Sequence, residues 1–553
     1  MAEQVAATRV KGWRLLRAAL TSRKTATMLA LGFASGLPFV ALIGTLNAWL
    51  GERQVSLATI GVLSWIGLAY AFKFLWSPVV DRTRPPLLAR LGRRKSWLVL
   101  CQLALAALLM GMAATDPVAA IGSFALLAVV AAFFSATQDV VIDAWRIEIA
   151  DGVDDAGGAT VEVLSAIYQL GNRTAALAGG AGALVAAARI GWPAVYATIG
   201  GVMVLLALAT LLAPEAVPPE EDAAEPLAGH VVPDRRRRAV ALAVVAVGWG
   251  WAIWMLGSFM VAALTPLAPG EKAASAGDFT KFWGPWIVVA TVVVPAIVAA
   301  WANGYAMPSA GAAGSAGRRA ADHVYRALVL PLSEIVGRLR WGAIVVVALI
   351  LSYRIADSIW APFAFPFYLE FLSYSNDEVA FASKIFGVLM TIAGVALGGL
   401  MFATLGRMPT MLAGAIAAAA TNLLYADLAL GGAGIDGFAA LFGLDRLGAD
   451  QRMVRLCIAI AGENIAGGLA GAAFVAYISS IVAKQYSAVQ YALLSSLTFL
   501  VGALGRAAMG EAIGQVGYAS VFQFTAALGL IAVGLVLVEW WRGAPRAPEV
   551  VAV

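Results

Sequence analysis

FFSATQDVVIDAWR, residues 133–146, closes a long apolar segment with two carboxylates and an amide. Asp139 and Asp143 are four residues apart, so a helix places both on one face, with Gln138 near its edge. A carboxylate near the centre of a bilayer costs roughly 2.5–3.5 kcal/mol on insertion scales, and such groups normally face a polar or hydrated interior. We therefore expect this stretch to carry a function inside a membrane-embedded bundle.

The composition is that of a membrane protein. Of the 553 residues, 61% are hydrophobic and 13% are charged, and the mean hydropathy is +0.83. A soluble domain needs more polar surface than this. The two cysteines lie within apolar segments and no CxxC pair occurs, so we expect no disulfide framework, no metal and no other cofactor. The basic residues lie in loops beside apolar segments, which favours the bilayer rather than nucleic acid as their partner.

Apolar runs of about 20 residues predict fourteen spans in a six, two and six arrangement. These lie near residues 28–50, 57–79, 96–114, 118–145, 160–188, 193–213, 239–265, 283–306, 341–370, 381–405, 408–430, 453–483, 488–511 and 518–541. The expected organisation is an amphipathic N-terminus (1–27), a six-helix bundle (28–213), a linker (214–238), an accessory two-helix hairpin (239–306), a linker with an interfacial helix (307–340), a second six-helix bundle (341–541) and a tail (542–553).

The positive charges predict the orientation. Most of the 38 lysines and arginines fall in alternate loops on the side of the N-terminal tail. Cytoplasmic loops carry the excess of lysine and arginine, so both termini are predicted to be cytoplasmic. Residues 1–27 form either a helix on the membrane surface or a solvated basic tail.

Two halves of six spans around a basic linker are typical of a transporter built from two parallel repeats. SPVVDRTRPPLLARLGRRKSW (77–97) follows the second span, and GGLMFATLGRMPTML (398–412) holds the corresponding place in the second half. The first resembles the loop signature of the major facilitator superfamily, with an insertion, and implies that all-α fold. The expected role is a cytoplasmic latch, and topology-setting charge alone is the alternative. The latch candidates are Asp81, Arg82, Arg93, Arg94, Arg407 and Trp145.

Charged residues inside the predicted spans suggest proton coupling and an anionic substrate. The proton-coupling candidates are Glu463 and Asp139 first, then Asp357 and Asp143. For Asp139 and Asp143 the alternative to proton coupling is a role in the latch. For Arg354 and Asp357 the alternative is a structural ion pair within one helix. Cations, amides and aromatic rings suit a large polar solute, although each aromatic residue also fits packing or an interfacial belt. The substrate-binding candidates are Gln138, Tyr70, Tyr168, Arg173, Arg354, Trp360, Lys384, Asn464 and Tyr477.

Five stretches together resemble the AmpG family of muropeptide permeases. They are LGFASGLPFVALIGTLNAWL (31–50), AYAFKFLWSPVVDR (69–82), FFSATQDVVIDAWR (133–146), GENIAGGLAGAAFVAY (462–477) and SAVQYALLSSL (487–497). The resemblance implies proton-driven import of muropeptides, N-acetylglucosaminyl-1,6-anhydro-N-acetylmuramyl compounds and their peptides, across the bacterial inner membrane for peptidoglycan recycling by alternating access. We expect a monomer that is not an enzyme, with the anhydromuropeptide, protons and the bilayer as partners.

The chain departs from the family pattern at three places. Gln169 stands where members can carry a basic residue, with Arg173 one turn later, and Arg354 replaces a lysine. The spans at 239–306 are predicted to be an accessory hairpin outside the transport path. The rival interpretations are a major facilitator transporter of another solute (a peptide, siderophore or drug), a membrane-embedded enzyme acting on lipid-linked sugars, and a sensor that binds its ligand without moving it.

Overall fold

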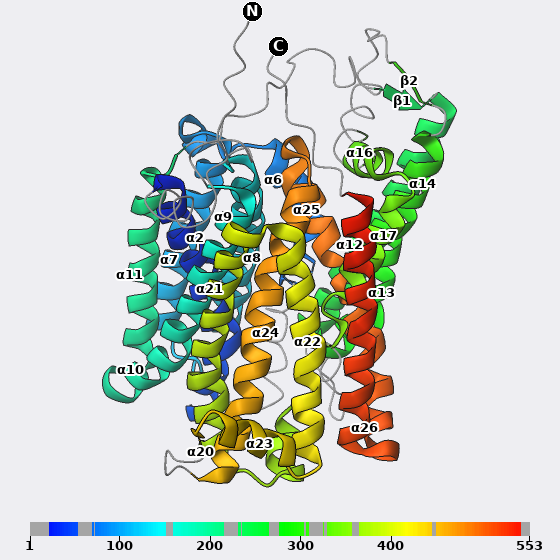
Figure 1. Cartoon of the computed structure of the whole chain (residues 1–553). Helices are drawn as coiled ribbons and strands as arrows, with labels where there is room; N and C mark the ends of the chain where they lie inside the picture. The colour runs from blue at the N-terminus through cyan, green and yellow to red at the C-terminus, as the bar shows by residue number, and fades with distance from the viewer. Residues whose placement is uncertain are drawn as a thin grey trace, which may run out of the picture.

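The computed structural model is a bundle of long helices in which the first described helix begins, and the last one ends, at the same end (Figure 1). It describes residues 22–53, 69–70, 72–150, 159–214, 231–233, 235–264, 276–303, 306–308, 325, 329–356, 364–444 and 450–543. Within these ranges ten helices are long and apolar enough to cross a membrane, or eleven if one bent pair counts as a single span. The predicted all-α, multi-pass architecture is confirmed, whereas most of the predicted span at 57–79 and residues 357–363 of the one at 341–370 lie outside these ranges.

The N-terminal half begins with a capped helix, because the Ser22 side chain accepts a hydrogen bond from the Lys24 N–H at 3.2 Å. Its elements are α2 (Arg23–Phe39), η1 (Val40–Thr45), α3 (Leu46–Glu52), η2 (Lys73–Leu75), α6 (Ser77–Arg82), η3 (Pro86–Leu91), α7 (Arg93–Ala114), α8 (Ile121–Glu148), α9 (Val161–Leu177), η4 (Ala178–Gly182), α10 (Ala183–Ile190) and α11 (Trp192–Leu211). The stretch that opened the sequence analysis forms the last turns of α8.

The middle of the chain forms two long helical segments, α12 and α13–α14, here called the hairpin, and the C-terminal half follows them. The middle elements are β1 (Val231–Pro233), α12 (Arg235–Leu264), α13 (Ala276–Val288), η5 (Val289–Val293), α14 (Val294–Asn303), β2 (Ala306–Pro308) and α16 (Leu330–Leu339). The C-terminal elements are α17 (Gly342–Ser352), α19 (Ala364–Pro366), η8 (Phe367–Phe371), α20 (Asn376–Ala380), η9 (Phe381–Phe386), α21 (Gly387–Leu405), α22 (Arg407–Ala429), α23 (Ala433–Leu441), α24 (Gln451–Ile481), η11 (Lys484–Tyr486), α25 (Ser487–Ser496) and α26 (Thr498–Arg542).

Two pairs of glycines mark matching positions in the halves. Gly92 (φ 90°, ψ 174°) precedes α7, and Gly406 (φ 85°, ψ −179°) precedes α22. Gly191 (φ 78°, ψ 157°) precedes α11, and Gly517 (φ 78°, ψ 167°) breaks α26 between the last two predicted spans. A positive φ strongly favours glycine. The same backbone turn therefore starts the third and the sixth span of each half, as a two-repeat architecture requires.

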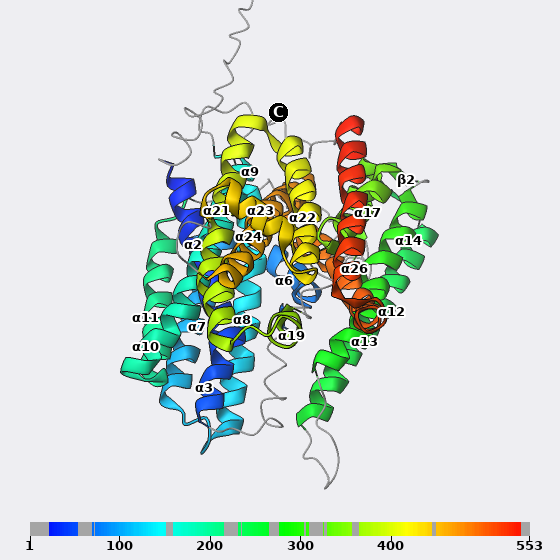
Figure 2. The same ribbon diagram turned by 60° about the horizontal axis from the view of Figure 1, so that its bottom comes forward.

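The halves meet along two lines. Helix α9 packs against α21 and α24, and α25 packs against α8 and α6. The hairpin α12–α14 lies at the edge of the bundle beside α26, as both views show (Figure 2). Helix α16 turns by 105° relative to α17 and contacts α14 and α25. A short amphipathic helix was predicted in this linker, and α16 occupies its C-terminal part.

Candidate functional site

A cavity of about 490 Å³ lies between the two halves. Its polar lining is Ser35, Tyr70, Lys73, Asp139, Asp143, Tyr168, Gln169, Asn172, Arg173, Tyr491, Ser495 and Ser496. A second cavity of about 140 Å³ is lined by Arg354, Thr391, Glu463, Asn464 and Gly467, and also by Arg173. Because Arg173 lines both, the two cavities form one polar region to which each half contributes charged side chains.

Lys73 connects both carboxylates of α8. Its Nζ lies 3.3 Å from Oδ2 of Asp139 and 3.6 Å from Oδ2 of Asp143, and the side chains of Lys73 and Asp139 are only 20% and 16% exposed. The Ser35 hydroxyl of α2 donates to Oδ1 of Asp139 at 2.5 Å and lies 3.0 Å from the hydroxyl of Tyr168. The two acids thus lie on one helix face, as expected, together with a cation that contacts both of them.

Arg146 adds a second cation below the cavity. Its Nη2 lies 3.1 Å from Oδ1 of Asp143 and donates to the Ser479 hydroxyl of α24 at 3.1 Å. Its guanidinium lies over the rings of Tyr168 and Tyr491, at 4.8 and 5.2 Å from their centres. A fully buried arginine therefore connects α8 and α9 of one half with α24 and α25 of the other.

Glu463 occupies the corresponding region of the C-terminal half. The Tyr425 hydroxyl of α22 donates to Oε2 of Glu463, and the Tyr368 hydroxyl lies 2.9 Å from that of Tyr425. The next residue, Asn464, accepts a 2.7 Å hydrogen bond from the Thr391 hydroxyl of α21. Glu463 is thus positioned by neutral hydroxyls, with the guanidinium groups of Arg173 and Arg354 around the same small cavity.

A cluster of ion pairs, here called the latch, closes the end of the bundle at which α26 ends (Figure 1). Nη2 of Arg94 lies 2.6 Å from Asp81 and 2.5 Å from Glu148, and Arg93 lies 3.1 Å from Glu148. The Ser487 hydroxyl at the start of α25 donates to Glu148 at 2.7 Å. Because α6, α7 and α8 belong to one half and α25 to the other, the latch joins the halves.

Comparison with known proteins identifies the relatives. The family profile described as acetyl-coenzyme A transporter 1 matches residues 25–118. The anhydromuropeptide permease of Escherichia coli K12 is 27% identical over 519 residues, which covers 93% of this chain and 79% of the relative. The putative transporter AmpG 4 of Rickettsia conorii is 25% identical, with 92% of this chain and 94% of the relative covered. The chain is thus similar to AmpG-type transporters over most of its length.

Solved structures give the fold. The proton:xylose symporter XylE, solved with 6-bromo-6-deoxy-D-glucose, aligns with a TM-score of 0.51 and 11% identity over 96% of each chain. The human organic anion transporter TETRAN aligns with a TM-score of 0.51 and 12% identity, covering 94% of this chain and 99% of the other. The chain is therefore a multi-pass membrane protein with the major facilitator fold, as the sequence predicted.

The structure places most of the predicted site residues in two groups, the cavity lining and the latch. The cavity lining includes Tyr70, Asp139, Asp143, Tyr168, Arg173, Arg354, Glu463 and Asn464. The latch includes Asp81, Arg93 and Arg94, while Arg82 lies on the same short helix α6 and Arg407 lies 4.0 Å from Glu162 of α9. Asp357 and Trp360 lie outside the described residues.

Four predicted residues lie elsewhere. The buried Gln138 amide donates to the Ala34 carbonyl of α2 at 2.7 Å, so it ties two helices together. The Tyr477 hydroxyl points to α26 and donates to Glu539 at 3.0 Å. Lys384 is exposed on η9, and Trp145 is fully buried in an apolar cluster with Leu98 and Val141.

Sequence reasoning missed several residues of this site. Arg146 and Glu148 follow the predicted span at 118–145 and were not among the candidates, although they belong to the last turns of the helix that carries Asp139. Lys73 lies within the predicted span at 57–79 and was not a candidate either. The partners on other helices, Tyr425, Ser487 and Tyr491, carried no local signal, because their function depends on which helix faces them.

Proposed function

We propose that this transporter imports anhydromuropeptides across the bacterial inner membrane by alternating access, driven by the proton gradient, for peptidoglycan recycling. The observation that carries the proposal is the polar region between the halves, where Lys73, Arg173 and Arg354 accompany tyrosines and amides. A muropeptide has two sugar rings and several carboxylates. Fixed cations match its carboxylates, and aromatic faces with hydroxyl groups match its sugars.

Alternating access requires that one end of the cavity be closed while the other is open. The latch of Arg94, Asp81 and Glu148 supplies a closure that joins the halves at one end. With both termini assigned to the cytoplasm, that closure lies on the cytoplasmic side. Substrate then enters from the opposite side and leaves after the latch opens.

Proton coupling requires a carboxylate whose protonation changes during the cycle. Asp139 and Glu463 face the polar region from equivalent helices of the two repeats. Protonation of either carboxylate removes a negative charge beside the lysine and arginine side chains that are proposed to bind the substrate. It thereby changes the relative free energies of the two conformations of the transporter. Asp143 shares Lys73 and Arg146 with this network and acts with Asp139.

The test is uptake of labelled anhydromuropeptide into vesicles with an imposed proton gradient. We expect accumulation that a protonophore abolishes and that unlabelled anhydromuropeptide inhibits, while peptides, siderophores and drugs do not compete. If one of those solutes competes better than anhydromuropeptide does, that solute is the substrate and the proposed substrate is wrong. If Asp139→Asn and Glu463→Gln both keep gradient-driven accumulation, the proton assignment is wrong.

A further inference from the structure

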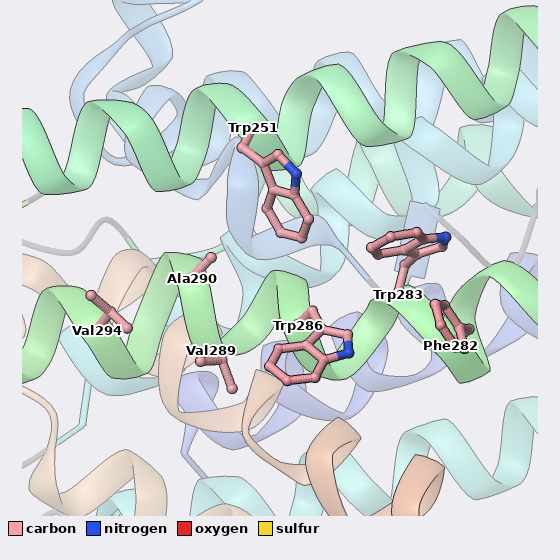
Figure 3. Close-up of a pocket in the computed structure, with 7 residues that line it drawn as sticks. All are labelled: Trp251, Phe282, Trp283, Trp286, Val289, Ala290 and Val294. Atoms are coloured by element: carbon pink, nitrogen blue, oxygen red, sulfur yellow. The ribbon is translucent and has the colours of Figure 1, made fainter.

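The hairpin α12–α14 contains an aromatic groove that the transport cycle does not use. The groove has a volume of about 540 Å³ and is open to the outside of the bundle. Trp251 of α12 projects toward the second helix of the hairpin, which carries Phe282, Trp283 and Trp286 (Figure 3). The indoles of Trp251 and Trp283 lie 6.2 Å apart. The lining is apolar throughout.

The inner side of the groove is closed by close helix packing. Gly248 of α12 lies against the backbone of Ala290, so closely that a methyl group at this position would clash with it. One residue later the indole Nε1 of Trp249 donates to the carbonyl of Thr291 at 3.0 Å. The second helix contains Pro285 and the π-helical turn η5, both of which bend a helix. The two helices therefore touch at Gly248 and separate around Trp251, which leaves a groove rather than a packed seam.

Positive charge lies at one end of this groove. Helix α12 begins with four arginines, of which Arg236 is exposed. The guanidinium of Arg237 lies over the ring of Trp301, 5.3 Å from its centre, at the end of α14. The pairing of β1 with β2 holds these two helix ends together. An arginine over a tryptophan at a helix end is typical of the membrane interface, where lipid phosphates lie.

The spacing matches one lipid chain. Val294 and Trp286, at the two ends of the groove, are seven and fifteen residues from Trp301, or about 10 and 22 Å along a helix. One leaflet, measured from its headgroups to the middle of the bilayer, is about 20–22 Å thick. A phosphate held at Arg236 and Arg237 thus places the terminal half of an acyl chain in the groove, beside Trp251 and Trp286.

We propose that the hairpin binds an anionic phospholipid, with its phosphate at Arg236–Arg238 and one acyl chain in the groove between Trp251 and Trp286. Arginines confer the preference for anionic headgroups, because the zwitterionic headgroup carries no net charge. The aromatic walls hold the chain through shape and dispersion. The site is independent of the substrate cavity.

The experiment uses the purified full-length protein and phospholipids with brominated acyl chains, which quench nearby tryptophans. Brominated phosphatidylglycerol is titrated against brominated phosphatidylcholine. We expect brominated phosphatidylglycerol to quench at a concentration at least about tenfold lower than brominated phosphatidylcholine does. The part of the quenching that saturates at low lipid concentration is expected to disappear in the double variant Trp251→Phe/Trp286→Phe.

Two variants separate headgroup from groove. Arg236→Gln/Arg237→Gln is expected to raise the half-saturating phosphatidylglycerol concentration about tenfold, whereas the control Arg84→Gln/Arg90→Gln, at two exposed arginines of the N-terminal half, leaves it unchanged. Val294→Trp fills the groove and is expected to remove the saturating phase with the arginines intact. Equal quenching by both lipids, or no change in either variant, would show annular lipid only and overturn the proposal.

Discussion

Asp139 and Glu463 lie on the fourth span of the first repeat and the fourth span of the second, yet their surroundings differ. Asp139 lies 3.3 Å from Lys73, which also reaches Asp143 at 3.6 Å. Glu463 accepts a hydrogen bond from the neutral Tyr425 hydroxyl and shares its small cavity with Arg354 and Arg173. Asp139 is thus in contact with an ammonium group, and Glu463 is in contact with a tyrosine hydroxyl.

The difference suggests a division of roles. The contacts of Lys73 with Asp139 and Asp143 form in a cavity between the two halves, so we expect these contacts to change when the halves move. A carboxylate that accepts from a hydroxyl can exchange a proton while keeping this neighbour. We therefore expect Glu463 to carry the proton, and the contacts of Lys73 with Asp139 and Asp143 to form or break as the conformation changes.

The largest effect is expected for Lys73→Met. It leaves Asp139 and Asp143 in the buried site without the cation they share, and breaking a buried ion pair costs about 3–5 kcal/mol. We expect a large fall in the thermal midpoint of the purified protein, together with loss of uptake.

The control is the double variant Lys73→Met/Asp139→Asn. Removing one acid with the cation is expected to restore most of the thermal midpoint while uptake stays absent. A midpoint for Lys73→Met equal to that of the wild type would mean that the pair adds nothing to stability, and the contrast between the two acids would lose its basis.

The second effect concerns Glu463→Gln. The substitution keeps the shape and the hydrogen bond with Tyr425, so folding and substrate binding are expected to persist. Accumulation against a gradient is expected to stop, whereas exchange of labelled for unlabelled substrate continues, because exchange needs no net proton movement. Tyr425→Phe serves as the milder comparison, with slower accumulation. Normal accumulation by the glutamine variant would assign the proton to the other repeat.

The third effect compares the two contacts that join the halves at the latch end. Glu148 accepts from Arg93, Arg94 and Ser487, while Glu162 faces Arg407 at 4.0 Å. A charged hydrogen bond is worth about 1.5–3 kcal/mol, so Glu148→Gln is expected to raise the open fraction at this end about tenfold. Glu162→Gln is expected to change it far less.

This third prediction is measured by the distance between spin labels at the exposed Arg90 and Arg340, in a chain whose two cysteines are replaced. The distribution is expected to shift to longer distances for Glu148→Gln. Equal shifts in the two glutamine variants would mean that the ion pair between Arg407 and Glu162 stabilises the closed form of this end of the bundle as much as the latch does.

The smallest effect is at the opposite end, where each half has an exposed ion pair. Hydrogen bonds from Arg455 hold the pKa of Asp436 below its ordinary value, while the pKa of Asp116 is lowered first by the backbone N–H groups of Ala119 and Val118. A carboxyl group whose pKa is lower in the folded than in the unfolded protein stabilises the fold at a pH above its unfolded-state pKa of about 3.9. This stability is lost as the pH falls through the folded-state pKa.

Asp436→Asn is therefore expected to lower the thermal midpoint slightly at pH 7, and by less as the pH falls below the unfolded value of about 3.9. Arg455→Gln is expected to reproduce this loss, whereas Arg53→Gln leaves the midpoint nearly unchanged because backbone groups still bind Asp116. Thermal melts of the three variants in detergent across this pH range provide the measurement. A larger loss for Arg53→Gln would reverse the expected order.

The sequence predicted the architecture well because a bilayer leaves a strong signal. Polar residues in an apolar run are conspicuous, so Asp139 and Glu463 stood out, and the glycine–arginine echo at Gly92 and Gly406 proved to be one backbone turn used twice. Both inferences rest on local chemistry that each segment carries by itself.

The partners of the site could not be predicted in the same way. Tyr477 was expected at the cavity, yet its helix turns it toward Glu539, while Tyr491 of α25 lines the cavity instead. Hydropathy gives the depth of a residue in the membrane but not the direction in which it points. Similarly, Glu148 was not a candidate, because its contact with the start of α25 joins segments that are far apart in the sequence. Such contacts depend on the packing of distant segments.

The pairing of β1 with β2 bears on how the hairpin came to lie in the middle of the chain. Val231 pairs with Pro308 and Pro233 with Ala306, so the segment enters and leaves the bundle at almost the same point. Its two helices cross in opposite directions and return the chain to the side from which it left. A segment with adjoining ends and an even number of crossings is a self-contained module, which a transporter gene can gain or lose without inverting any helix that follows.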